Sequence, residues 1–400
     1  MKLNTFFKAT LAATLLVIPA ARAEHFAWRN LQSDIHGVAP STDENLVNPW
    51  GIAVGPDGHR IWVANNGTGT ATVYDALGKT VPADSPLVVS IPAATQGFTG
   101  TPTGMVRHLA AFGATPSGDF IIHNASMTVS GSAKYLFCSE DGVISGWNPE
   151  VDAANARIVL DNSANGAIYK GMAISHIGEG AIRLYLANFK GGKIEVYDGA
   201  FAPDTALANK INAADIAPIA GYAPYNIRHY AIRKAHSVSR YIIVAYAKQD
   251  SSGAQELHGA GLGYINVFDS AGNFVKRLVD VSLDADNPNA LNAPWGMAIS
   301  RHQSGASDDV LFVGNFGDGK IHRYRLGGDF SGTPRGALKG VRGNDLQFDG
   351  LWDLRFGSKV QAEKIAAQDS DELNESDTVL YFTAGIADEG HGLFGMIVRR

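Results

Sequence analysis

The densest group of chemically capable side chains is the segment ADEGHG at residues 387–392, which holds Asp388, Glu389 and His391. Two carboxylates and an imidazole can coordinate a metal ion, or they can serve as acid and base partners. The spacing does not place them on one face of a helix. The same residues therefore also fit a solvated loop that is held by its own hydrogen bonds, and both interpretations stay open.

Further polar groups stand in other glycine-rich segments of the chain. Glu140 and Asp141 supply carboxylates, and Asn65, Asn188 and Asn315 supply amide oxygens. Such oxygens suit a hard cation like Ca²⁺, but Asn, Asp and Gly are also the residues that turns favour. The candidate calcium ligands are Glu140, Asp141, Asp388, Glu389 and His391.

Six copies of one sequence unit would position these loops. The phrase VNPWGIAVG at 47–55 returns as NAPWGMAIS at 292–300, and in degraded form as YKGMAIS, PYNIRHY and GLWDLRF. The segment KYLFCSEDGVISGWNP at 134–149 supplies the second and third apolar runs of one further unit. Short runs of Val, Ile, Tyr, Phe and Leu follow each copy, bounded by Gly, Asn or Asp, which is typical of strands. Repeats of three or four strands predict an all-β, six-bladed β-propeller, whose loops between second and third strands converge on one face.

The repeated phrase itself has a structural interpretation. Gly51 and Gly296 let the innermost strand crowd the central axis, and Trp50 and Trp295 can fill the wedge between blades. Inter-blade connections also open onto the funnel of a propeller, so the same tryptophans are alternatively platforms on which a ligand stacks. The candidate ligand-binding residues are Trp50, Asn65, Asn188, Trp295, Asn315 and Trp352.

The N-terminal segment 1–23 reads as a secretory signal peptide. It has Lys2 and Lys8 in a basic head, an apolar run over 11–20, and a small-residue cleavage site that ends at Ala23. We therefore expect cleavage after Ala23, secretion or periplasmic export, no membrane span, and one propeller domain over 24–400. The last repeat lacks an outer strand, and HFAWRNLQSD at 25–34 is the segment expected to complete it.

Composition excludes some partners. The chain has 33 basic and 39 acidic residues, a net charge of −6, and loss of the basic signal segment makes it more negative. Nucleic acid and anionic membranes would repel such a chain. The only cysteine, Cys138, stands in an apolar run, cannot form an intramolecular disulfide, and is expected to be a buried bystander. We expect a monomer.

Several motifs together resemble a known family. NLVNPWGIAV, SEDGVISGWNP, AYAKQD, LNAPWGMAIS and LYFTAGIADEGHGLFG are similar to an uncharacterised bacterial family of secreted propellers related to NHL-repeat proteins. Some of its members carry a PEP-CTERM sorting tail. The resemblance implies the fold and export, but it implies no catalytic residues. This chain ends at GMIVRR without a sorting signal, which favours release.

These observations favour a binding module for a small polar or carbohydrate-like ligand, or for an envelope or extracellular protein. The alternative is a calcium-dependent hydrolase or lactonase of the propeller type, in which the ion polarises an ester carbonyl or activates water. A scaffold that binds proteins through its rim is a third class. Separately, Arg228, Arg355 and, on a doubtful alignment, Arg107 occupy similar inner-strand positions, where they would attract an anion or form inter-blade ion pairs.

Overall fold

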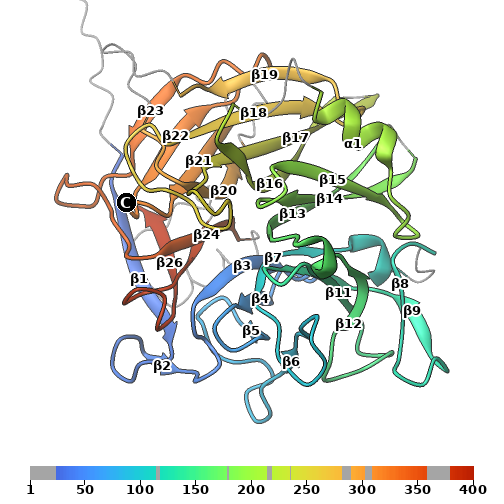
Figure 1. Cartoon of the computed structure of the whole chain (residues 1–400). Coiled ribbons are helices and arrows are strands. Elements are labelled where there is room, and N and C mark those ends of the chain that lie inside the picture. Colours follow the sequence, from blue (N-terminus) through green and yellow to red (C-terminus); the bar gives the residue numbers. More distant parts are fainter. Residues whose placement is uncertain are drawn as a thin grey trace, which may run out of the picture.

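The computed structural model describes residues 24–113, 118–177, 180–213, 219–234, 236–281, 290–301, 309–357 and 379–400. In these ranges six antiparallel sheets stand radially around one axis, so the six-bladed propeller is confirmed (Figure 1). Each sheet begins with its innermost strand. The signal segment 1–23 lies outside the described residues, so the boundary at Ala23 stays a prediction.

Blades 1 to 3 follow the chain order. Blade 1 consists of β3 (Pro49–Val54), β4 (Ile61–Asn65), β5 (Thr70–Tyr74) and β6 (Val88–Ser90). Blade 2 consists of β7 (Pro102–Arg107), β10 (Tyr135–Ser139), β11 (Val143–Trp147) and β12 (Arg157–Asp161). Blade 3 consists of β13 (Tyr169–His176), β14 (Ile182–Asn188) and β15 (Lys193–Asp198). A separate hairpin sits beside blade 2 and consists of β8 (Ile121–His123) and β9 (Ser130–Ser132). Short helices are η1 (Leu109–Phe112), η2 (Ser163–Asn165) and α1 (Thr205–Ile211).

Blades 4 to 6 complete the ring. Blade 4 consists of β16 (Tyr222–Lys234), β17 (Ser237–Lys248), β18 (Gly263–Asp269) and β19 (Phe274–Val279). Blade 5 consists of β20 (Pro294–Ser300), β21 (Val310–Asn315), β22 (Ile321–Arg325) and β23 (Pro334–Ala337). The chain then enters blade 6 with β24 (Leu351–Phe356), β25 (Leu380–Ala384) and β26 (Leu393–Arg399). Blade 6 ends with two strands from the other end of the chain, β1 (Phe26–Ser33) and β2 (Ser41–Thr42).

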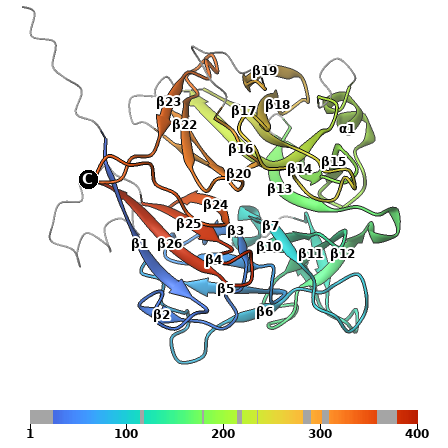
Figure 2. The same ribbon diagram turned by 60° about the vertical axis from the view of Figure 1, so that its left-hand side comes forward.

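The ring is closed by both ends of the described chain, as the sequence predicts. β1 pairs antiparallel with β26, from Phe26 opposite Arg399 to Ser33 opposite Leu393, and the two strands lie side by side in Figure 2. The outermost position differs from the expectation, because β2 adds a short parallel pairing beyond β1. This closure covers the edge of β26, which would otherwise present unpaired backbone groups.

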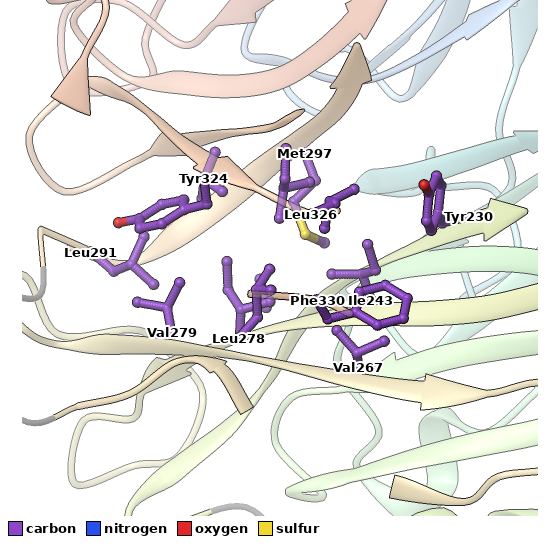
Figure 3. Close-up of a cluster of buried hydrophobic side chains, with 14 of the residues drawn as sticks. Tyr230, Ile243, Val267, Leu278, Val279, Leu291, Met297, Tyr324, Leu326 and Phe330 are labelled. Atoms are coloured by element: carbon purple, nitrogen blue, oxygen red, sulfur yellow. The ribbon is translucent and has the colours of Figure 1, made fainter. Parts of the chain in front are cut away.

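The blades are held together by apolar clusters between their faces. Figure 3 shows the cluster between blades 4 and 5, where Tyr230 and Ile243 face Met297 and Tyr324, all of them buried. Alternation along each strand sends side chains to both faces of a blade, and each face meets a neighbouring blade. No helix in the described ranges is long and apolar enough to cross a membrane.

Glycine at the inner strands is required by close approach between blades. A Cβ added to Gly171 would lie 2.3 Å from Oδ1 of Asn226, and one added to Gly296 would lie 2.4 Å from the carbonyl oxygen of Trp352. These distances are far below contact distance, so the predicted crowding of the axis is confirmed. The inner strands are therefore fixed close together, and the side chains at their ends point into a shared central space.

Candidate functional site

One position of the repeated phrase builds the floor of the funnel. In blade 1 it is the residue just before Gly51. In the other blades it is the residue just before the equivalent of Gly51, which is Gly104, Gly171, Asn226, Gly296 or Asp353. The residues at this position are Trp50, Thr103, Lys170, Tyr225, Trp295 and Trp352, and all six are buried. Five blades place an uncharged side chain at the axis, so the ammonium group of Lys170 is the exception.

The three tryptophans close the axis as a stacked group. The Trp50 and Trp352 rings stack with centroids 3.3 Å apart, and Trp295 meets each of them edge-on at 5.6 Å. Phe316 stacks on Trp352 from the loop after β21. The exposed fractions of Trp50, Trp295 and Trp352 are 2%, 1% and 1%, so the predicted burial is confirmed. Contact with a ligand stays a prediction for these residues.

Lys170 lies above this group and pairs with carboxylates from two loops. Its Nζ donates to Oε1 of Glu140 at 2.6 Å and lies 3.9 Å from Oε2 of Glu256. The Trp50 ring lies on another side, with its centroid 5.1 Å from Nζ. Burial alone would lower the pKa of Lys170, but Glu140 and Glu256 outweigh it and the pKa lies above its ordinary value. Lys170 is therefore a buried, charged centre with 2% of its side chain exposed.

The carboxylates around Lys170 exceed the positive charge that it supplies. Burial, together with the nearby charges of Glu140 and Glu256, raises the pKa of Glu389. Burial also pushes the pKa of Glu256 upward, but His258, Lys170 and Tyr225 reverse this and lower it. Glu256 Oε2 and Glu389 Oε1 are buried without a hydrogen-bond partner, and so is Nε1 of Trp50. Such groups cost free energy unless a ligand or water pairs with them.

Glu389 reaches the funnel from a strained turn. Ala387, Asp388 and Glu389 have φ values of 54°, 52° and 62°, which place three consecutive non-glycine residues in the left-handed region. That conformation costs about 1–2 kcal/mol for each such residue. The backbone amide of Ala387 holds the turn by donating a hydrogen bond to Oδ2 of Asp349 at 2.9 Å. Strain of this kind is often found where a side chain must be placed for binding or catalysis.

The five candidate metal ligands are only partly brought together. Glu140 and Glu389 meet around Lys170, whereas Asp141 accepts a hydrogen bond from the Ala94 amide at 2.9 Å. His391 turns away and pairs through Nδ1 with Asp34 at 2.6 Å. Asp388 is exposed. Among the described residues, no group of three or more His, Cys, Asp or Glu side chains is arranged to hold a metal ion, and the calcium site stays a prediction.

The three candidate asparagines form hydrogen bonds within the strands and loops of the blades. The side-chain amide of Asn65 donates to Thr70 and Thr72, and that of Asn315 donates to the carbonyl of Ala290. Asn188 donates to Glu195 at 2.9 Å and accepts from the Gly191 amide. Asn188 also lines a polar cavity of about 870 Å³ beside blade 3. Any ligand contact of these residues stays a prediction.

Two central residues of the site, Lys170 and Glu256, are not among the candidates predicted from the sequence. Lys170 stands in YKGMAIS at the place where the other blades have Trp, Tyr or Thr, so comparison of the copies could have found it. Glu256 lies in the long segment between β17 and β18, where no periodicity marks it. The buried Cys138 agrees with its expected role, because burial raises the pKa of its thiol to about 12 and makes it unreactive.

The fold and this site define a six-bladed β-propeller with a charged centre on its funnel floor. No family model matches the chain. It is 30% identical over 367 residues to the uncharacterized protein R648 of Acanthamoeba polyphaga mimivirus, covering 90% of this chain and 77% of that protein, and it belongs to the same family. The uncharacterized protein L690 of the same virus is 28% identical, with 92% and 84% covered.

Solved structures are only distantly similar. An α-L-arabinofuranosidase of Fusarium graminearum, solved as a point mutant in complex with an iminosugar inhibitor, has a TM-score of 0.48 and 9% identity, with 93% of this chain and 97% of that chain covered. The relatives found by sequence are viral and uncharacterized, so they correct the expected bacterial origin of the family. They assign no activity or ligand, and the relation to NHL-repeat proteins stays distant.

Proposed function

We propose that the chain is a binding module that takes a small, hydroxyl-rich polar ligand at the funnel floor. The observation that carries this proposal is the set of buried atoms around Lys170 that lack a hydrogen-bond partner, namely Oε2 of Glu256, Oε1 of Glu389 and Nε1 of Trp50. The first two are hydrogen-bond acceptors when ionised and the third is a donor. A sugar-like hydroxyl group both donates and accepts, so it matches the whole set.

Charge supports the same ligand class. The charges of Glu140, Glu256 and Glu389 all act on the ammonium group of Lys170, so the carboxylates outnumber it and an anionic ligand would be repelled. An ammonium ligand would satisfy the carboxylates but could not accept from the indole of Trp50, because it has no free lone pair. A neutral polyol or saccharide meets both requirements, and its binding pairs groups that the free protein leaves unpaired.

Thermal melting and tryptophan fluorescence test this proposal on the purified protein. Neutral mono- and oligosaccharides should raise the melting temperature and change the emission of the tryptophan group that lies under the site. Glu256→Gln and Glu389→Gln should weaken both responses, whereas the exposed Glu44, changed to Gln, serves as the matched control. The proposal fails if no saccharide shifts melting or emission, or if only Ca²⁺ does so in a way that EDTA reverses.

A hydrolase is the second candidate, and it is favoured by one observation. The pKa of Glu389 is raised and that of Glu256 is lowered within one cluster, which is the pattern of an acid and a base partner. Lys170 already supplies the positive charge that a metal would bring. Release of product from ester or glycoside substrates, lost in both Gln variants and retained at Glu44→Gln, would favour this function over binding alone.

Export is a further part of the proposal. The signal segment ending at Ala23 supports secretion or periplasmic delivery, where a soluble saccharide or an envelope protein would be the partner. N-terminal sequencing of protein recovered from the producing cells tests it. A mature N-terminus at Glu24 is expected, and retention of Met1 in the folded protein would contradict export.

A further inference from the structure

A second charged centre lies farther along the inner strands, about three residues after the position of Lys170. Arg228 and Arg355 stand two residues after Asn226 and Asp353, which replace the glycine of the repeated phrase. Arg107 stands three residues after Gly104, so the alignment expected from sequence is corrected by one position. All three arginines nevertheless line one cavity.

Among the described residues that line or adjoin the cavity, Asp353 is the carboxylate that forms an ion pair with one of these arginines, Arg228. Asp353 Oδ1 accepts from Nη2 of Arg228 at 2.6 Å and from the Leu354 amide at 2.8 Å. Its Oδ2 accepts from the Ile52 amide at 2.8 Å. Asp353 is 4% exposed at its side chain, and its oxygens are committed to these bonds. It cannot neutralise the remaining guanidinium groups.

The other two arginines have no carboxylate bound to them. Arg107 donates through Nη1 to the carbonyl oxygen of Val54 at 2.6 Å. No hydrogen bond or ion pair joins Arg355 to the part of the chain that the structure describes. Burial, and then the charge of Arg228, lowers the pKa of Arg355 to about 9, although Asp353 opposes this. Arg355 therefore remains a cation at neutral pH and lacks a counter-ion.

Unpaired donors point to the same place. Nε of Arg228 and Nε2 of His229 are buried without a hydrogen-bond partner. Burial, and then the charges of Arg301 and Arg240, lowers the pKa of His229 to about 4, so the imidazole is neutral at pH 7. The cavity has a volume of about 160 Å³, and its lining includes Arg107, Arg228, His229 and Arg355. One water needs only about 10–15 Å³ of such space, so a small polyatomic ion fits.

We propose that this cavity binds a small oxyanion, phosphate or a short carboxylate, held between Arg107, Arg228 and Arg355. Guanidinium groups form forked, charge-assisted hydrogen bonds with planar or tetrahedral oxyanions. The anion supplies the negative charge that Asp353 alone does not. The site is separate from the funnel floor, and it does not depend on the function proposed there.

Calorimetry and thermal melting of the purified protein test this inference. Inorganic phosphate and succinate, each compared with sodium chloride at equal ionic strength, distinguish the two sources of an oxyanion. We expect one of them to bind with one site and to raise the melting temperature. Arg355→Gln should weaken this binding about tenfold or more, because it removes a charge-assisted contact.

Two further variants keep the test decisive. Arg107→Gln should also weaken binding, and it replaces Arg355→Gln if that variant does not fold. Arg335→Gln changes an exposed arginine of β23 and should bind as the wild type does. The inference is overturned if neither oxyanion binds at matched ionic strength, or if the cavity variants bind as tightly as Arg335→Gln.

Discussion

Replacing Lys170 with methionine tests the electrostatic reasoning most directly. The substitution keeps much of the side-chain volume but removes the ammonium group from a site where Lys170 is 2% exposed and Glu256 is 7% exposed. Breaking a buried ion pair by removing one partner costs about 3–5 kcal/mol, because the remaining charge stays buried. Glu140 is 25% exposed and can recover hydration. We therefore expect a loss in unfolding free energy of about 3 kcal/mol, at the lower end of that range.

The pH dependence separates lost charge from lost packing. In the wild type, Glu256 has a lowered pKa, so its contribution is present above its unfolded pKa and is lost as the pH falls through the folded value. Without Lys170, the pKa values of Glu256 and Glu389 should rise, so the variant regains stability as these groups become protonated. The deficit should thus be largest near neutral pH and should shrink at mildly acidic pH.

Urea unfolding followed by tryptophan fluorescence measures this deficit. A second variant, Lys170→Met combined with Glu256→Gln, should recover part of the loss, since it removes a buried charge as well as its partner. A deficit that is the same at neutral and acidic pH would show that Lys170 acts through packing. A neutral-pH deficit below about 1 kcal/mol, the value of an exposed pair, would refute a buried ion pair at the funnel floor.

Four other variants test the fold. Trp50→Ala and Trp295→Ala should each cost about 3–5 kcal/mol of unfolding free energy, as measured by urea titration, and unchanged stability with lost ligand-dependent fluorescence would show a binding role. Deletion of β1, Phe26–Ser33, should cost roughly 3–6 kcal/mol through the loss of two buried apolar side chains, and native melting would contradict the closure. Gly171→Ala should lower the melting temperature by several degrees, because its Cβ meets Asn226, and a neutral outcome would show that the inner strands can separate.

Much of the fold could be predicted because its cause is local and repeated. Each copy of the phrase carries its own strand pattern, and the missing outer strand of the last unit left one free segment near the N-terminus, which is β1. The site was harder, because residues in loops meet only after the ring closes. His391 shows why: its partner, Asp34, follows β1 and is 357 positions away in the sequence. No spacing within ADEGHG could indicate that pairing.

The polar and charged residues of the central sites stand at positions where one blade differs from the others. A position that is alike in most blades is fixed by the shared geometry, as glycine is at 51, 104, 171 and 296. A residue that breaks the pattern must be tolerated by a particular environment. Asn226 takes the glycine position and donates to the carbonyl of Trp295 at 2.8 Å, so the exception joins blade 4 to the neighbouring blade 5. Lys170 breaks the pattern of uncharged residues and collects carboxylates from neighbouring loops.

The arginines follow the same rule farther along the inner strands. Arg228 and Arg355 stand where the remaining blades have Ala or Val, and Arg228 pairs there with Asp353 of blade 6. Successive strand residues rise by about 3.3 Å, so the three residues from the Lys170 position to the Arg228 position separate the two centres by about 10 Å along the axis. The stacked tryptophans lie at the funnel end of this path. One ring of nearly identical strands thus carries an acidic centre and a basic centre, and each is defined by the few residues in which the copies differ.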